Sequence, residues 1–201
     1  MLIPAQVARG VTLIEMLIAV GILSVLLAAG TPSFNTWLQT SRIRTAAETI
    51  QTGLQLARTE AVRRNTPVQF VLGNGSSWTV GCVNVVADAD GDGIDECPET
   101  IQARSESEGP PNAVVATSEV SGANNAAVNP AAFTDTLIFN GLGRIGAGLG
   151  GGNLAVFAMS NPTGGQCAPD GPMRCLRVEV SNAGQMRMCD PALAAADPRG
   201  C

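Results

Sequence analysis

The chain has 201 residues, of which 45% are hydrophobic and 14% charged, and its formal net charge at pH 7 is −5. It has no histidine, so the most common general base and metal ligand is absent, which argues against an enzyme. Residues 66–201 carry fourteen acids and six arginines, which argues against a broad surface for binding polyanions.

The N-terminal third predicts a short leader followed by one long helix. Residues 1–10 lack the apolar core and cleavage site of an ordinary secretory signal. Residues 11–31 are predicted to be the transmembrane half of the helix, because about 20 apolar residues match the hydrocarbon thickness of a bilayer. Glu15 is the only charge in this stretch, and Pro32 is predicted to kink or locally melt the helix.

Residues 32–66 are predicted to continue as an amphipathic half-helix. Apolar residues recur there at steps of three and four, with polar residues and arginines on the other face. Asn65, Thr66 and Pro67 form a stop signal. We expect the apolar face of this half to lie on a β-sheet.

Residues 67–201 predict a β-rich globular domain that contains disulfides. Short runs with strand character alternate with Gly, Asn, Pro and Asp. The segment Ser181–Gly184 predicts the turn of a terminal hairpin. Residues 105–132 are predicted to be mostly loop, and residues 147–153 a flexible glycine-rich turn. The predicted strands are Val68–Leu72, Trp78–Val86, Leu137–Phe139, Leu154–Met159, Cys175–Val180 and Gln185–Cys189.

All six cysteines lie beyond residue 81, which predicts structural disulfides formed in an oxidising compartment. Cys82 and Cys97 bracket an acidic loop and are expected to pair. The other four allow two arrangements: Cys175–Cys189 with Cys167–Cys201, or Cys167–Cys175 with Cys189–Cys201. A thiolate metal site is the alternative, and the lack of histidine and of a C-x-x-C pair disfavours it.

The acidic loop at residues 88–99 fits the calcium-loop pattern D-x-[DN]-x-[DN]-G-x5-E. The pattern would make Asp88, Asp90, Asp92, Glu99 and the carbonyl group of Ile94 the ligands of a weakly bound calcium ion. Asp95 stands where such loops have an apolar residue. The alternative is a solvated Asp-Gly turn without a cation.

The N-terminus resembles the class III signal of type IV prepilins. Gly10 matches the residue before the cleavage site, Glu15 matches the glutamate five residues later, and Pro32 matches a helix-breaking proline found in many pilins. Val11 stands where these proteins usually have phenylalanine. The resemblance implies that a prepilin peptidase cuts after Gly10 and methylates the new N-terminus at Val11.

Further segments resemble the GspH/FimT group of minor pilins and pseudopilins: residues 56–65, Trp78 to Gly81, residues 174–178 and residues 184–191. This resemblance implies an α+β fold, in which the long N-terminal helix packs on a C-terminal antiparallel β domain. It implies a minor pilin that takes part in priming or tip assembly of a type IV pilus. Its partners would be other pilins, bound through the N-terminal helix, and the prepilin peptidase.

In that setting Glu15 would pair with the Val11 ammonium group of a neighbouring subunit inside the filament. The protein would be a single-pass inner-membrane protein with its C-terminal domain in the periplasm, until it enters a surface pilus. One alternative is a minor pseudopilin of a type II secretion system.

The other alternative is a DNA receptor at the pilus tip. Some FimT-type proteins bind DNA through a Gly-Arg-x-Arg element, which here reads Gly184-Gln185-Met186-Arg187. Gln185 replaces the first arginine of that element. Arg187, Arg174 and Arg177 would then provide the phosphate contacts.

Overall fold

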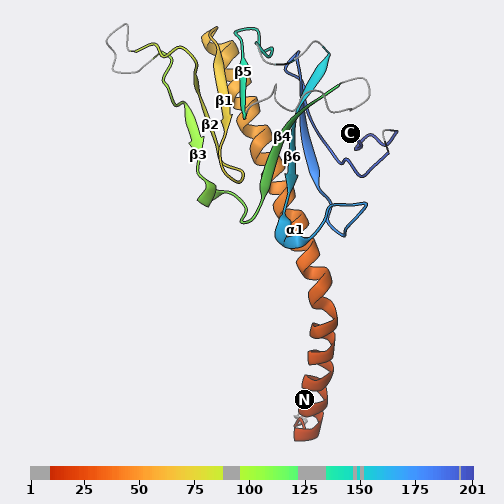
Figure 1. The fold of residues 1–201 in the computed structure, drawn as a ribbon. Helices are drawn as coiled ribbons and strands as arrows, with labels where there is room; N and C mark the ends of the chain where they lie inside the picture. The colour runs from red at the N-terminus through yellow and green to blue at the C-terminus, as the bar shows by residue number, and fades with distance from the viewer. Residues whose placement is uncertain (1–9, 88–95, 122–134, 147–148, 150–151, 195) are drawn as a thin grey trace, which may run out of the picture.

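The computed structural model describes residues 10–87, 96–121, 135–146, 149, 152–194 and 196–201, with the backbone alone at residues 29–33. One long helix projects from a domain built of two β-sheets (Figure 1). This is the pilin-like α+β fold that the resemblance implied, with the helix packed on antiparallel sheets.

Helix α1 spans Leu13–Arg64 and begins and ends at residues that cap it. The hydroxyl group of Thr12 accepts a hydrogen bond from the backbone N–H of Glu15 at 3.3 Å, which satisfies one free donor of the first turn. Asn65 ends the helix in the left-handed conformation, with φ 49°. This conformation is common at helix C-termini, and it confirms the predicted stop before Pro67.

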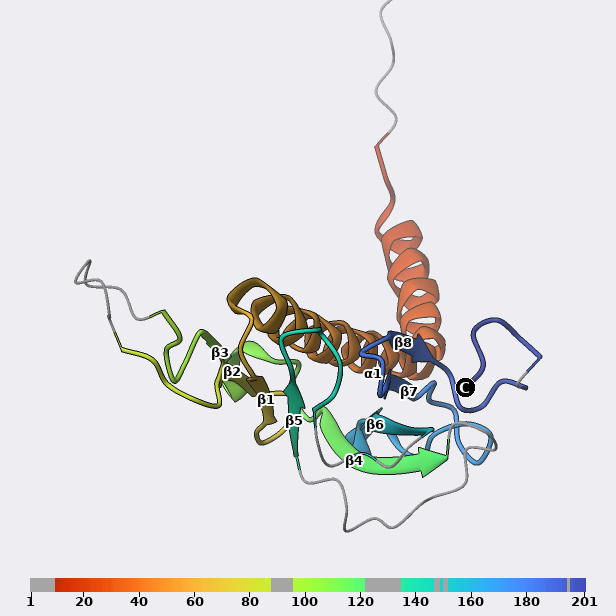
Figure 2. The same cartoon turned by 90° about the horizontal axis from the view of Figure 1, so that it is seen from above.

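The helix continues through Pro32, so the predicted local melting does not occur. Its N-terminal and C-terminal halves nevertheless point in different directions when the molecule is seen from above (Figure 2). A proline within a helix is an ordinary cause of such a bend. Within the described residues, no helix has a segment both long and apolar enough to cross a membrane.

In the described part of the domain the strands form two four-stranded antiparallel sheets, with strand orders β3-β2-β1-β5 and β4-β6-β7-β8. Two short 3₁₀-helices, η1 (Glu106–Glu108) and η2 (Pro162–Gly164), lie between strands. The strands are β1 (Val68–Leu72), β2 (Trp78–Cys82), β3 (Gln102–Arg104), β4 (Val114–Ser121), β5 (Thr136–Phe139), β6 (Asn153–Ser160), β7 (Leu176–Ser181) and β8 (Met186–Cys189).

The core lies where the C-terminal half of α1 contacts both sheets. Fully buried residues recur on this half at steps of three and four, as the amphipathic pattern predicted. Beside the helix, Phe70 of β1 and Phe157 of β6 meet edge to face with ring centroids 5.7 Å apart, which joins the two sheets. The buried helix residues are Ile43, Ala46, Ala47, Ile50, Leu54, Ala57 and Ala61.

The strand predictions were wrong in three places. Strand β3 (Gln102–Arg104) was not predicted. Residues 105–132 contain the eight-residue strand β4, which pairs with β6 along its whole length. Half of its residues are polar, because β4 lies at a sheet edge and its buried acid, Glu119, accepts a hydrogen bond from Asn153 at 2.7 Å. Strand β2 ends at Cys82 rather than at Val86, which forms an isolated bridge with Cys97 instead.

The terminal hairpin is confirmed. Gly184 donates to the carbonyl group of Ser181 at 2.8 Å, and its φ of +74° is the left-handed conformation that a three-residue hairpin loop needs. A side chain at Gly184 would also collide with the carbonyl oxygen of Gly143. Glycine is therefore required here both for its backbone conformation and for its size.

Candidate functional site

The N-terminal half of α1 presents a wide apolar surface. Twelve large apolar side chains are between 56% and 78% exposed there. Exposed apolar surface on this scale marks a site of interaction with another apolar body. These side chains are Val11, Leu13, Ile14, Met16, Leu17, Ile18, Val20, Ile22, Leu23, Val25, Leu26 and Leu27.

Gly10, Val11 and Glu15 lie at the exposed start of this apolar surface. Glu15 is the only acid in the first turn of α1, and its carboxylate has no hydrogen bond or ion pair among the described residues. It is therefore available to a group outside this protomer. The leader upstream of Gly10 and the side chain of Pro32 lie outside the described residues.

Four residues of the predicted calcium loop, Asp88, Asp90, Asp92 and Ile94, lie outside the described residues. Glu99, the fifth, is exposed. The two ends of the loop are held together by the Cys82–Cys97 disulfide and by two backbone hydrogen bonds between Val86 and Cys97, at 3.0 and 3.2 Å. The calcium site stays a prediction.

The structure contains three disulfides. Besides Cys82–Cys97 it joins Cys167 to Cys175 and Cys189 to Cys201, which is the second of the two arrangements left open by the sequence. The alternative pairing of Cys175 with Cys189 is not the one formed. The Cys189–Cys201 bridge fixes the C-terminal tail to the end of β8. The backbone N–H of Asp190 also donates a hydrogen bond to the carbonyl oxygen of Arg199 there, at 2.7 Å.

Two of the three arginines proposed for DNA contacts are paired with acids of the same chain. Arg174 donates to Asp190 at 2.9 and 3.1 Å, and Arg187 donates to Glu179 at 2.9 Å. Arg177 is half-buried and has no ion pair among the described residues. Two of the three guanidinium groups are thus already bound to carboxylates of this chain, and DNA binding stays a prediction.

Among the described residues, one group of side chains could in principle hold a metal ion. It consists of Glu179, Cys189 and Cys201, whose carboxylate oxygen and sulfur atoms all lie within 4.8 Å of one another. Both sulfurs belong to a disulfide, so neither offers a thiolate ligand. A metal site there does not fit the oxidised protein.

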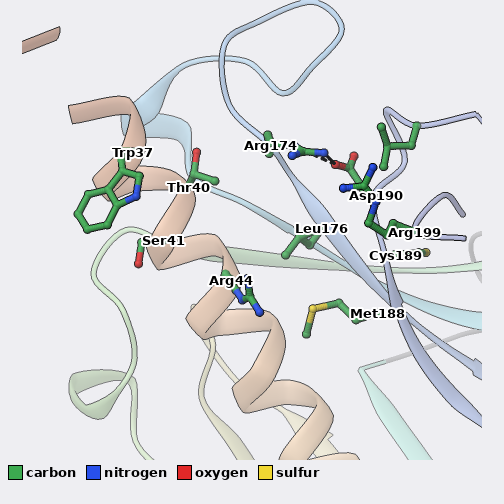
Figure 3. Close-up of a pocket in the computed structure, with 11 residues that line it drawn as sticks. Trp37, Thr40, Ser41, Arg44, Arg174, Leu176, Met188, Cys189, Asp190 and Arg199 are labelled. Carbon is green, nitrogen blue, oxygen red and sulfur yellow. Dashed lines mark hydrogen bonds and ion pairs between the residues drawn. The ribbon is translucent and has the colours of Figure 1, made fainter. Parts of the chain in front are cut away.

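A groove of about 540 Å³ separates α1 from β8 and the C-terminal tail. Figure 3 shows Arg44 extending from the helix toward Leu176 and Met188, while Arg174 joins Asp190 on the opposite wall. We call this the α1–β8 groove. It is lined by Trp37, Thr40, Ser41, Arg44, Arg174, Leu176, Met188, Cys189, Asp190, Leu193 and Arg199.

The tail side of the groove is organised by ion pairs. The side chain and the backbone N–H of Arg199 both donate to Asp197, which lowers the pKa of that carboxyl to about 2. This groove was not predicted from the sequence, because its walls come from segments that are far apart in the chain: α1, β7, β8 and the tail. The signal in the sequence that could have pointed to it is Trp37, a large aromatic residue in a mostly polar part of the half-helix.

Residues 46–184 match the family described as Type II transport protein GspH, and residues 6–31 match the prokaryotic N-terminal methylation motif. No curated protein was found to match the sequence.

Two similar solved structures are a minor pilin and a minor pseudopilin. The type IV minor pilin FimU of Pseudomonas aeruginosa is 18% identical with a TM-score of 0.47, covering 78% of this chain and 94% of FimU. The minor pseudopilin EpsH from the Type 2 Secretion System of Vibrio cholerae is 12% identical with a TM-score of 0.41, covering 77% of this chain and 99% of EpsH. Since the family match spans more than half of the sequence, the chain belongs to the GspH family, as a minor pilin or pseudopilin with an N-terminal methylation motif.

Proposed function

We propose that the protein is a minor pilin that primes a type IV pilus or lies at its tip, after a prepilin peptidase has cut it behind Gly10. The observation that supports this best is the exposed apolar surface of α1 between Val11 and Leu27, which contains one acid. Membership of the pilin family makes the role structural rather than enzymatic.

Assembly would follow from burying this surface. Each buried apolar side chain of this size contributes about 1.5–3 kcal/mol, so packing against neighbouring helices supplies the main driving force. Cleavage after Gly10 creates an ammonium group on Val11, which is the N-methylation site in this proposal. Glu15 of one subunit pairs with that ammonium group on the next, and an unpaired charge in an apolar core would be strongly unfavourable, so this pair sets the register between helices.

Before assembly, the same surface would hold the protein in the inner membrane, with the β domain in the periplasm. In this proposal the membrane-embedded segment is residues 11–31, which include the start of α1 at Leu13. An oxidising periplasm is also where the three disulfides would form.

A second candidate is a minor pseudopilin of a type II secretion system, favoured by the family match to Type II transport protein GspH. The two candidates use the same helix surface and differ in the machine that contains it. A clean deletion in the native bacterium, with surface pili and secreted proteins counted in the same cultures, separates them. Loss of pili alone supports the pilin, and loss of secretion alone supports the pseudopilin.

The deletion strain then tests the assembly contact. A Glu15→Val chain should insert and be cleaved but fail to restore the lost function, because the ammonium group has no partner. Glu48→Val removes an exposed acid from the same helix outside the apolar surface and serves as the control. Full complementation by Glu15→Val, or intact pili and secretion in the deletion strain, would count against the proposed function.

A further inference from the structure

The α1–β8 groove has the composition of a protein-binding surface. Five of its eleven lining residues are Trp, Met or Arg, the side chains enriched where proteins contact one another. The whole chain has only two tryptophans, six methionines and twelve basic residues. Trp37 is 64% exposed, which is unusual for so large an aromatic side chain in a protein without a partner.

Three arginines gather in the lining of the groove on an acidic protein. Arg44, Arg174 and Arg199 line it together with a single carboxylate, Asp190, whereas the chain as a whole has a net charge of −5. The three arginine side chains are 73%, 54% and 70% exposed. Arg44 and Arg199 are paired with Glu48 and Asp197 beside the groove, so an acidic ligand would be bound by the donors that the ion pairs leave free rather than by an excess of positive charge.

Each of these arginines keeps hydrogen-bond donors for a ligand. Arg44 binds Glu48 only through Nε, at 2.9 Å. Arg174 and Arg199 bind Asp190 and Asp197 through Nε and Nη2. All three Nη1 groups have no acceptor among the described residues, and the existing ion pairs hold two of the guanidinium groups in place.

The apolar wall of the groove favours a peptide over a nucleic acid. Leu176 and Met188 form an apolar wall, which suits an aliphatic or aromatic side chain and offers nothing to a phosphate. An acidic peptide segment can place its carboxylates at the rim and its apolar side chain between them.

We propose that the α1–β8 groove binds an acidic segment of a neighbouring pilin-type subunit, one that carries an apolar side chain beside its carboxylates. This inference rests on the proposed function, because it needs neighbouring subunits. The groove adds a second contact, on the β domain, to the contact along the apolar part of α1. Because the second contact is made between subunits already held together, a weak interaction is sufficient.

The test uses the full chain in the native bacterium. A photo-crosslinking residue, p-benzoylphenylalanine, replaces Thr40 in the groove, and cross-linked peptides are identified by mass spectrometry. The expected product joins Thr40 to a pilin-type subunit at a segment with at least two acids and an apolar residue. The same residue placed at the exposed Thr59, on the same helix outside the groove, should not give this product.

Two substitutions test the role of charge. Arg44→Glu should lower the cross-linking yield about tenfold, as expected for reversing one exposed charge at an interface. Arg63→Glu is the matched control, because Arg63 is also an exposed α1 arginine paired with a neighbouring glutamate, and it should leave the yield unchanged. An acid-to-arginine change in the captured segment should restore cross-linking to the Arg44→Glu chain, which excludes misfolding as the cause of the loss.

The outcomes for the groove and for the proposed function are separate. Cross-links to lipid, to DNA or to a segment without acids, or no cross-link in cells that assemble filaments normally, would overturn the groove assignment and leave the proposed function standing. Intact pili and secretion after deletion of the gene would overturn both.

Discussion

Glu179 on β7 and Arg187 on β8 are register partners, and Arg187 Nε donates to the Glu179 carboxylate at 2.9 Å. The glutamate side chain is 2% exposed and the arginine side chain 55% exposed. The second carboxylate oxygen of Glu179, Oε1, is buried without a hydrogen-bond partner. A buried charge with one satisfied oxygen depends strongly on its single cationic partner.

Replacing that partner should destabilise the domain. Arg187→Met should lower the free energy of unfolding by about 3 kcal/mol, because it leaves the Glu179 charge buried and uncompensated. Urea unfolding of the purified protein measures the change. The exposed pair of Arg63 with Glu60 supplies the control, and Arg63→Met should change stability by less than about 1 kcal/mol.

Neutralising the glutamate should recover part of this loss. Glu179→Gln combined with Arg187→Met should be more stable than Arg187→Met alone. A single Arg187→Met variant as stable as the native chain would show that the pair does not hold the hairpin.

Gly53 lies in the middle of α1, where alanine would ordinarily stabilise a helix by about 1 kcal/mol. A methyl group at Gly53 would lie 2.8 Å from the rings of both Phe70 and Trp78. Gly53→Ala should therefore lower the melting temperature, because overpacking of a filled core is destabilising by about 1–3 kcal/mol. Gly21, with open space around it, is the matched glycine, and Gly21→Ala should not lower the melting temperature.

Trypsin should separate the two disulfide arrangements. Cleavage after Arg144, Arg174, Arg177, Arg187 and Arg199 puts the last four cysteines on four different peptides. Under non-reducing conditions, peptide 145–174 should stay linked to 175–177, and peptide 188–199 to 200–201. A link between 175–177 and 188–199 would contradict the structure.

The ion pair at the C-terminal tail should make the stability depend on pH in the acid range. Hydrogen bonds from Arg199 lower the pKa of Asp197 from 3.8 to about 2. A lowered acid pKa means that the folded state favours the charged form. Its contribution is therefore complete above pH 3.8 and is lost as the pH falls toward 2.

Asp197→Asn tests this dependence, because it keeps the size of the side chain and removes the titrating group. The variant should lose the part of the acid-range stability change that belongs to Asp197, as measured by urea unfolding at several pH values. Identical pH profiles for the native chain and the variant would show that the pair is too weakly formed in solution to contribute.

Features set by neighbouring residues could be predicted from the sequence. The helix ends at Arg64 because Asn65 adopts the left-handed conformation directly before Thr66 and Pro67. The β7–β8 turn forms because Gly184 supplies the positive φ that the loop needs. The N-terminal motif likewise lies within one short segment, and residues 6–31 match the prokaryotic N-terminal methylation motif.

Features that join distant segments were not decided by the sequence. Strand β4 was not predicted because its polar residues are typical of a loop. Its buried acid, Glu119, is tolerated because its carboxylate accepts a hydrogen bond from Asn153 on β6. The cysteine spacing left two pairings open, and the positions of the strands brought Cys189 to Cys201. The burial of Glu179 could not be predicted from the sequence of β7. Arg177, two residues earlier on the same face of the strand, suggests that this face is exposed to solvent.

The α1–β8 groove also could not be predicted from the sequence, because its residues lie far apart in the chain. Trp37 and Arg44 stand among ordinary surface residues of a helix, and Arg199 stands in the tail. Local conformational preferences and hydrogen bonds determined the end of the helix and the turn of the hairpin, because these depend on residues a few positions apart. Only tertiary packing decided the edge strand, the disulfide partners and the lining of the groove, because each of these depends on which distant segments the core brings together.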